Sequence, residues 1–468
     1  MRESFINRII KAKRLEELII ILFRYVSEGD EGSVLKAYSR EVNSESMIFP
    51  DSQELVQLLF VLLPYNSLGE WTSNVASLFR KYDEEKWKVL CYALLVEIDN
   101  NVDSIMDKKP YMFLHESYQT DDYIFILKTK RSFWEAEFEK NKIRRGRQTI
   151  EFKRDGIIST LKKYDVYKAS YFLDYKPIVQ YDINAIRRYH NKRYIFDDDI
   201  KIAIFPLSNS KWFEVIENDW NNTFSIRDGF TDPNHTMRII NAIQKAEKDG
   251  YNIVIFPELA ISEEIKTVLQ RYIINNEFRK IKLFFFGTYW KNNENVSVLF
   301  NNQGTLLLEE KKKVKFQYYN TEKECYISED LKKESNIHFI DINGLGRIAY
   351  LICADMLDTS ITTVYSIIRT DFLFVSACTR KTNLMVSRAK SNANEHAITT
   401  IVCNTCVNAE KKDYNNYSAY VCTLKIGKGI IQSNPVCEEL ICNNEMLCSN
   451  CLKQALISKK AETTENIS

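Results

Sequence analysis

Three residue types that together can attack a carbon–nitrogen bond follow strand-like segments in the second half of the chain. Glu258 comes just after the buried run 252–256, Lys313 lies in a basic strand, and Cys353 ends the run 347–352. A cysteine is a potent nucleophile only as the thiolate, and a neighbouring carboxylate can take its proton. A fixed ammonium can stabilise the negative charge that develops when an amide or nitrile carbon is attacked. Together the three types predict nucleophilic catalysis.

Each of the three residues also has a structural interpretation. Glu258 could be a carboxylate that is favoured near the start of a helix. Lys313 belongs to the run Lys311-Lys312-Lys313, so it could be solvated surface. A single Cys353 could equally be a buried core cysteine. Their order and contexts, rather than any one of them, favour a catalytic interpretation.

The elements that must position these residues appear after residue 200, where short buried strands alternate with amphipathic helices. This alternation predicts a layered α/β domain. The expected helices are 235–249, 263–275 and 388–397, and Gly250 suits a helix C-terminal cap. The expected strands are 201–205, 252–256, 282–286, 296–300, 347–352, 371–375, 399–403 and 418–424.

The first half of the chain instead repeats apolar residues at helical spacing, as in Leu15, Leu18, Ile19 and Leu22. Such stripes are typical of helix faces that pack into a core. We therefore predict an all-helical domain over residues 1–197, with a role in recruitment, oligomerisation or regulation. This half offers no catalytic motif.

Several motifs of the second half, taken in order, resemble the nitrilase, or carbon–nitrogen hydrolase, superfamily. The resemblance covers about residues 200–425 and rests on the Phe256-Pro257-Glu258 turn, the lysine strand and the Cys353-Ala354-Asp355 turn. Further matches are Phe286-Gly287-Thr288, Ala393-Asn394-Glu395-His396 and Asn404. The resemblance implies a nitrilase-like αββα sandwich over residues 198–430.

The resemblance also implies roles for the site residues. Glu258 is the expected general base, Cys353 the nucleophile that forms a thioester, and Lys313 the stabiliser of the developing charge. A second glutamate after the lysine is expected at Glu322, with Glu324 in the same window. The expected substrate is a small non-peptide amide or nitrile, without cofactor or metal, and the expected assembly is a homo-oligomer. The alternative is a nitrilase-fold effector or binding module in a bacterial defence or nucleic-acid-associated assembly.

Bulk composition adds the expected setting. Among the 468 residues, 64 Lys and Arg nearly cancel 63 Asp and Glu, so net charge gives no global argument for nucleic acid or a membrane surface. No segment has the length of a membrane span, and no signal sequence is recognisable, so a cytoplasmic location is expected. The Lys, Asn and Ile bias suggests a bacterial source. A basic stretch over residues 140–154 leaves open a nucleic-acid or protein partner for the N-terminal half.

The remaining segment, residues 431–468, is expected to form a cysteine-containing tail. Its cysteines are Cys437, Cys442, Cys448 and Cys451. Structural zinc sites use four ligands, often in closely spaced pairs. Only the second pair has that spacing and the connection between the pairs is short, so we predict that no zinc is bound.

Overall fold

The computed structural model divides into two compact units, each described here by itself. The first contains the described residues up to Leu173 and residues 179–181, and the second contains residues 174–178 and those from 199 onward. The structure describes residues 2–28, 30–44, 48–62, 68–108, 116–128, 161, 163–181, 199–207, 214–227, 234–342, 344–379, 382–405, 417–423, 430–435 and 453–458.

The first unit has a helical core that buries the predicted apolar stripes. Phe5, Phe79 and Trp87 meet there, with ring centroids 5.3–5.7 Å apart, and such aromatic contacts add to the stability gained from apolar burial. The helices are α1 (Arg2–Lys11), α2 (Leu15–Ser27), α3 (Glu31–Asn43), α4 (Ile48–Leu62), α5 (Leu68–Lys81), η2 (Glu84–Lys86) and α6 (Trp87–Lys108).

A three-stranded sheet accompanies these helices, so the prediction of an all-helical domain over residues 1–197 is wrong. Its strands, in the order β1-β2-β3, are β1 (Tyr118–Gln119), β2 (Tyr123–Leu127) and β3 (Tyr164–Lys168), followed by η4 (Ala169–Tyr171). The segments of β2 and β3 are rich in aromatic and β-branched residues, which favour strands. Their pairing joins residues about forty positions apart, as in Ile124 opposite Tyr167. The helical spacing of apolar residues in other segments does not reveal this pairing.

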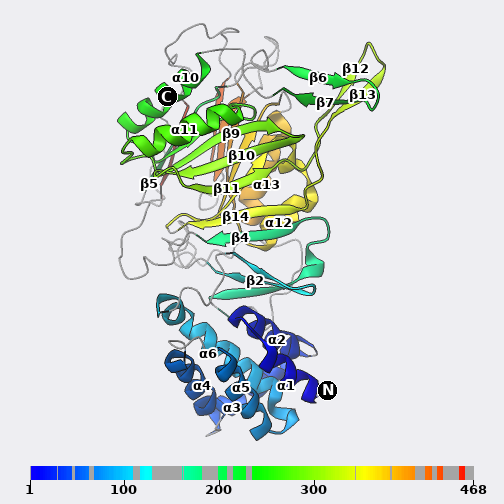
Figure 1. Cartoon of the computed structure of the whole chain (residues 1–468), viewed down its shortest axis with the longest axis vertical. Helices are drawn as coiled ribbons and strands as arrows, with labels where there is room; N and C mark the ends of the chain where they lie inside the picture. Colours follow the sequence, from blue (N-terminus) through cyan, green and yellow to red (C-terminus); the bar gives the residue numbers. More distant parts are fainter. Residues whose placement is uncertain are drawn as a thin grey trace. The chain divides into compact units, whose positions relative to one another are not determined.

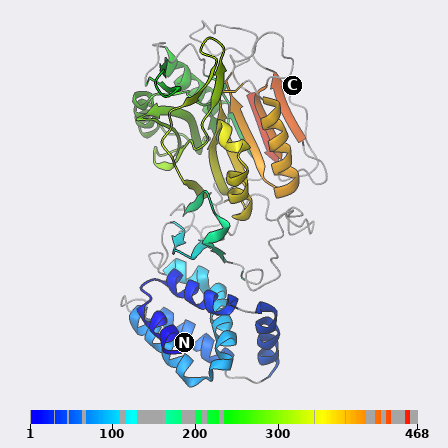
Figure 2. The same cartoon turned by 90° about the vertical axis from the view of Figure 1, so that its right-hand side faces the viewer.

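The second unit is built on two sheets that pack face to face and are seen as two layers in Figures 1 and 2. The six-stranded sheet, in the order β11-β10-β9-β8-β5-β20, consists of β5 (Asp199–Ile204), β8 (Ile253–Ile255), β9 (Leu283–Lys291), β10 (Glu294–Asn301), β11 (Leu306–Lys311) and β20 (Lys453–Ser458). The seven-stranded sheet, in the order β19-β18-β17-β16-β15-β14-β4, consists of β4 (Lys176–Tyr181), β14 (Asn336–Ile342), β15 (Gly346–Ile352), β16 (Phe372–Ala377), β17 (Thr399–Asn404), β18 (Tyr417–Thr423) and β19 (Ile430–Pro435). The division into units falls within β4, whose residues 176–178 belong to the second unit and 179–181 to the first.

Helices connect the parallel strands at the centre of each sheet. The connections β5–β8 and β8–β9 run through α10 (His235–Lys248) and α11 (Glu263–Asn275), and β15–β16 and β16–β17 run through α12 (Thr359–Ile367) and α13 (Thr382–His396). Parallel neighbours require such crossovers. α10 and α11 lie on the outer face of the six-stranded sheet, and α13 contacts β17 and β18 of the other sheet. The α/β layering predicted after residue 200 is observed.

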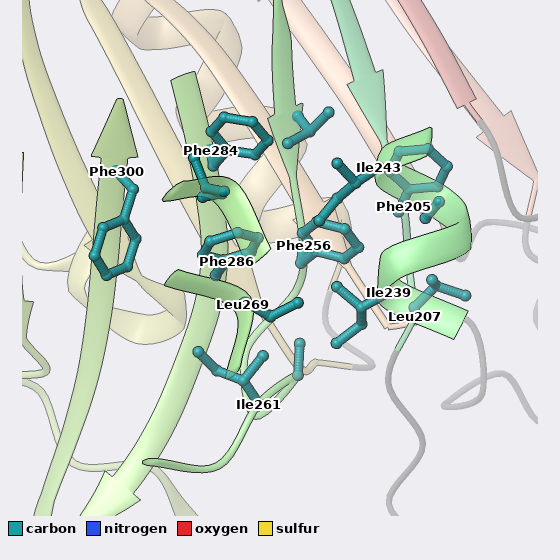
Figure 3. Packing of buried hydrophobic residues seen from close by; sticks show 14 of the residues in the cluster. Phe205, Leu207, Ile239, Ile243, Phe256, Ile261, Leu269, Phe284, Phe286 and Phe300 are labelled. Carbon is teal, nitrogen blue, oxygen red and sulfur yellow. The ribbon is translucent and has the colours of Figure 1, made fainter. Parts of the chain in front are cut away.

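Alternating side chains of the strands divide the core into two layers. Phe285 faces the opposite sheet and stacks on Phe374 with a centroid distance of 4.0 Å. Its neighbours Phe284 and Phe286 point the other way, into the cluster that β8 and β9 form with α10 and α11 (Figure 3). A strand that is buried on both faces has a continuous run of apolar residues. This explains why β8 and β9 could be predicted from the sequence.

The edges of the two sheets extend beyond the expected domain limits of 198 and 430. Lys176 of β4 donates a backbone hydrogen bond to Ser335 O at 2.8 Å. β20 pairs antiparallel with β5, with Ala455 opposite Ile202. The described parts of the expected tail 431–468, β19 and β20, therefore belong to the two sheets.

A further four-stranded sheet lies at one end of this unit (Figure 1). Its order is β12-β13-β7-β6, with β6 (Val215–Asn218), β7 (Thr223–Ile226), β12 (Gln317–Asn320) and β13 (Cys325–Glu329). Two hairpins form it: β6–β7 precedes α10, and β12–β13 follows β11.

Candidate active site

Glu258 is placed by a tight turn after β8. The next residue, Leu259, has a left-handed φ of 55°, and its backbone N–H donates to Thr288 Oγ1 at 2.8 Å. Gly287 of β9, with φ +77°, approaches this turn so closely that a Cβ there would lie 2.0 Å from Pro257 O. Only glycine combines that φ with that space, so the Phe256-Pro257-Glu258 turn depends on Gly287.

Cys353 follows β15 and has a left-handed φ of 48°. That conformation is uncommon and strained for a residue with a Cβ. Inside the adjacent core, Tyr350 Oη accepts a hydrogen bond from Gly287 N at 2.9 Å and lies 2.8 Å from Ser376 Oγ, which donates to Phe256 O at 2.6 Å. This network joins the strands that carry Cys353 and Glu258.

The lysine beside Glu258 is Lys312. Its Nζ lies 2.8 Å from Glu258 Oε1 and 2.8 Å from Glu329 Oε1. Asn295 Nδ2 donates to the same Glu258 oxygen at 2.9 Å, and Phe316 N donates to Glu329 Oε2 at 2.7 Å. The side chains of Lys312 and Glu258 are only 1% and 4% exposed, so these protein groups, rather than water, stabilise the two charges.

The prediction of Lys313 as the pocket lysine is therefore wrong by one residue. Lys313 Nζ pairs with Glu310 and donates to Lys311 O at 2.7 Å. Successive side chains of an extended segment point to opposite faces. Lys312 N donates to Asn295 O at 2.8 Å, which continues the β10–β11 pairing and puts Lys312 on the side of Glu258.

The second carboxylate that contacts Lys312 is that of Glu329, and the structure does not bring Glu322 or Glu324 to the site. Both are exposed in the turn between β12 and β13, where Glu322 N donates to Asn320 Oδ1 at 3.0 Å. Glu329 lies seventeen positions after Lys312, because the β12–β13 hairpin intervenes. A sequence signal was present: in the alternating segment 326–329, Ile327 and Glu329 share one buried face.

Charges and burial determine the protonation of this cluster. Burial opposes the ammonium of Lys312, but the carboxylates of Glu258 and Glu329 outweigh it, so the pKa of Lys312 is raised well above its usual value. Burial also raises the pKa of Glu329, although Lys312 opposes that shift. The pKa of Cys353 is raised well above normal by burial and then by the charge of Glu258, with Lys312 acting in the opposite direction. The thiol is therefore protonated at rest.

Asp355 joins the cysteine turn to the lysine turn. Its Oδ1 accepts hydrogen bonds from Lys313 N at 3.0 Å and Val314 N at 2.8 Å. Its Oδ2 is buried without a hydrogen-bond partner, and burial raises the pKa of Asp355 to about 7. Asp355 thus fixes the backbone beside Lys312 relative to Cys353, two residues away.

A cavity of about 860 Å³ opens onto Glu258, Lys312, Glu329 and Cys353. Glu258 and Cys353 thus line one cavity, together with Lys312 and Glu329, whereas Lys313 and Glu322 do not line it. The other lining residues are Val215, Glu217, Phe224, Ile226, Leu259, Phe316, Gln317, Tyr318, Tyr319, Tyr326, Cys378 and Thr379. A thiol, a carboxylate and an ammonium facing one cavity can support nucleophilic attack and stabilise the charge that it creates.

Metal binding has no candidate in the part of the chain that the structure describes, because no group of three or more His, Cys, Asp or Glu there could hold an ion. The four tail cysteines Cys437, Cys442, Cys448 and Cys451 lie outside the described residues, as does the basic stretch 140–154. Among the described helices, none combines the length and the hydropathy of a membrane span.

Comparison with known proteins finds similarity in solved structures alone. No family model and no curated protein matches the sequence. Nit3 of Saccharomyces cerevisiae, a nitrilase-superfamily member, matches with 18% identity and a TM-score of 0.36 over 57% of this chain and 93% of that one. An amidase from Nesterenkonia sp. matches with 14% identity and a TM-score of 0.38 over 57% and 92%. The glutamine-dependent NAD+ synthetase of Acinetobacter baumannii matches with 16% identity and a TM-score of 0.38 over 56% and 46%.

Proposed function

We propose that the second unit is a cysteine-dependent hydrolase that cleaves a non-peptide C–N bond, as in a small amide or nitrile. Cys353 is the nucleophile, Glu258 the general base, Lys312 the cation that stabilises the developing charge, and Glu329 the residue that orients Lys312. One observation carries this proposal: the Lys312 ammonium is buried between two carboxylates in the cavity that Cys353 lines.

The chemistry follows from the protonation of these groups. The Cys353 thiol transfers its proton to Glu258 as the sulfur attacks the amide carbon, and the carbonyl oxygen becomes negatively charged. The Lys312 ammonium, with the backbone N–H that follows Cys353, stabilises that oxygen. The C–N bond then breaks, and the proton on Glu258 goes to the departing amine. Water, deprotonated by Glu258, hydrolyses the thioester and restores the thiol.

A purely structural role explains this cluster less well. Replacing a buried ion pair with apolar residues of similar volume is often neutral or stabilising. Buried charges that open onto a cavity next to a strained nucleophile are therefore better explained by chemistry than by stability. The ordered motifs that resemble the nitrilase superfamily support the same roles for Glu258 and Cys353.

The test is turnover and trapping of the thioester. The chain should release ammonia from simple amides, and hydroxylamine should convert the acyl group to a hydroxamate. Cys353→Ala should abolish both, while Cys325→Ala, which changes a half-buried cysteine of β13, should retain both. Hydroxamate formation that survives in Cys353→Ala would contradict Cys353 as the nucleophile.

Other expectations stay predictions. These are a homo-oligomeric assembly, a cytoplasmic location, a bacterial source, and a nucleic-acid or protein partner for the first unit. The alternative of a binding or effector module makes a different prediction for the same experiment, since it requires no turnover. A wild-type chain that binds amides but never forms hydroxamate would favour that alternative.

A further inference from the structure

One face of the four-stranded sheet forms a wall of the cavity. The register of the strands in this sheet places that wall beside the proposed catalytic residues. In this sheet Glu217 lies opposite Phe224, and Phe224 lies opposite Glu329. Directly paired residues project from the same face. Phe224 is therefore held beside the carboxylate that contacts Lys312.

The same face continues as an apolar surface. Val215 lies opposite Ile226, and Tyr318 lies opposite Ile327, two residues before Glu329. Val215, Phe224, Ile226 and Tyr318 all line the cavity. Phe224 and Tyr318 also contact each other, with a centroid distance of 5.8 Å. The wall that faces the reacting groups is thus built from aromatic and branched side chains.

The polar groups of this wall are bound to one another. Glu217 accepts hydrogen bonds from the Tyr318 hydroxyl and from Lys323 Nζ, the latter at 2.7 Å. The hydrogen bond from Lys323 lowers the pKa of Glu217, and burial together with Glu217 raises the pKa of Tyr318 to about 12. At neutral pH Tyr318 is therefore a neutral phenol whose hydroxyl is engaged, which leaves its ring to contact a ligand.

We propose, on the basis of the hydrolase function above, that the substrate carries an apolar ring that packs against Phe224, Ile226 and Tyr318 while its C–N bond lies at Cys353. The cavity of about 860 Å³ is in the range that holds drug-sized ligands and is far larger than a simple aliphatic amide needs. Aromatic rings stack or meet edge to face with rings of a ligand as they do with each other.

Four amides test this proposal in the wild-type chain. Phenylacetamide carries the ring on the acyl side and acetanilide carries it on the amine side, whereas acetamide lacks a ring and succinamate carries a charge. One of the two ring amides should exceed acetamide in kcat/KM by about 10-fold or more, the scale on which apolar pockets discriminate. Preference for succinamate or acetamide would overturn the ring proposal.

Variants test whether the preference for ring amides arises from the cavity wall that contains Tyr318. Tyr318→Ala should lower the ratio of kcat/KM for the preferred ring amide to kcat/KM for acetamide by about 10-fold, while Tyr318→Phe should keep that ratio. Trp220→Ala is the matched control, because Trp220 lies in the β6–β7 turn and is 99% exposed. An equal loss for all amides in Tyr318→Ala would mean that Tyr318 has a structural role, and would contradict the proposal.

A binding measurement separates this inference from the function on which it rests. The Cys353→Ala chain should bind phenylacetamide or acetanilide more tightly than acetamide in calorimetry. Ring-selective binding without wild-type turnover of any amide would refute the hydrolase and keep the ring site. Turnover of amides without ring selectivity would refute only the ring site.

Discussion

At the scale of single residues, two adjacent lysines have different partners. Lys312 forms ion pairs with Glu258 and Glu329. The side chain of Lys313 points to the opposite face of the extended segment and forms an ion pair with Glu310. Glu310 also accepts a hydrogen bond from His338 N at 2.6 Å. Both lysines neutralise buried carboxylates, but only Lys312 lines the cavity. Loss of either should cost stability, and loss of Lys312 alone should cost catalysis.

Replacing each lysine with the similarly long, uncharged methionine separates the two roles. Breaking a buried ion pair costs roughly 3–5 kcal/mol, so both Lys312→Met and Lys313→Met should lower the urea midpoint of unfolding. Lys312→Met should also lower kcat per folded molecule by about 100-fold or more, the effect of removing one group that stabilises the oxyanion. Lys313→Met should keep kcat within a few fold. A reversed pattern would restore Lys313 to the site.

Asp355 gives a prediction for stability against pH. Its pKa is raised from 3.8 to about 7 by burial, so the native state keeps a proton that the unfolded chain releases near pH 4. This contribution to stability is complete below the unfolded pKa and is lost as pH rises towards 7. Asp355→Asn cannot ionise, and its Oδ1 can still accept from Lys313 N and Val314 N.

The measurement is the urea midpoint at about pH 5 and about pH 8, on either side of the raised pKa. The midpoint should fall less between the two pH values in Asp355→Asn than in the wild-type chain. Asp249→Asn is the control, since Asp249 forms an exposed ion pair with Lys245 at 2.9 Å. If Asp355→Asn and the wild-type chain lose equal stability, the carboxyl is ionised at pH 5 and the assignment is wrong.

Of the four proposed site residues, Glu258 and Cys353 could be predicted from the sequence, and geometry explains why Lys312 and Glu329 could not. Glu258 and Cys353 follow strands buried on both faces, which are easy to recognise. The side on which each member of a lysine run lies depends on the register of β11 against β10, and that register joins residues about fifteen positions apart. Glu329 could not be predicted in the same way, because the β12–β13 hairpin places it seventeen positions after Lys312.

At the scale of elements, the approach of β9 to the Glu258 turn gives a prediction on Gly287. In Gly287→Ala, a Cβ at 2.0 Å from Pro257 O would push the turn away and displace Glu258. We expect a loss of several kcal/mol, as for a steric conflict in a packed core, and a fall in kcat. Stability is read from urea unfolding and kcat from ammonia release.

Gly250→Ala is the matched control for backbone strain. Gly250 has φ +79° but no atom within 4 Å of a Cβ placed there. It should lose only the roughly 1–2 kcal/mol of a left-handed residue with a Cβ, without loss of kcat. Equal effects of the two substitutions would show that φ, rather than the contact with Pro257, explains the glycine at 287.

The elements differ in how well the sequence reveals them, and the reason is the range of their contacts. Strands were expected over 252–256 and 282–286, because continuous apolar runs mark strands covered on both faces, and β8 and β9 lie at 253–255 and 283–291. β20 was not expected, because its six residues pair with β5, about 250 positions earlier. The sequence of so short a segment does not indicate a pairing partner that is so far away in the chain.

At the scale of the whole molecule, the proposed chemistry resides in one of two units. All described residues that line the cavity belong to the second unit. The first unit, with its helical core and three-stranded sheet, contributes none of them. The second unit alone should therefore suffice for catalysis, provided that its sheets are complete.

Where the second unit begins is the last prediction. Residues 174–178 belong to it, Ser360 Oγ donates to Asp174 Oδ2 at 2.7 Å, and β4 is the edge strand next to β14. A chain of residues 174–468 should be monodisperse in size-exclusion chromatography and should retain wild-type kcat.

A chain of residues 199–468 lacks β4 and leaves β14 as the edge. β14 has the sequence Asn-Ile-His-Phe-Ile-Asp-Ile, and most of its side chains are buried. An exposed apolar edge strand is a template for pairing between molecules. We therefore expect the shorter chain to aggregate and to have a lower urea midpoint. If it matches the longer chain in both measurements, β4 contributes nothing to this unit, and its boundary lies at residue 199.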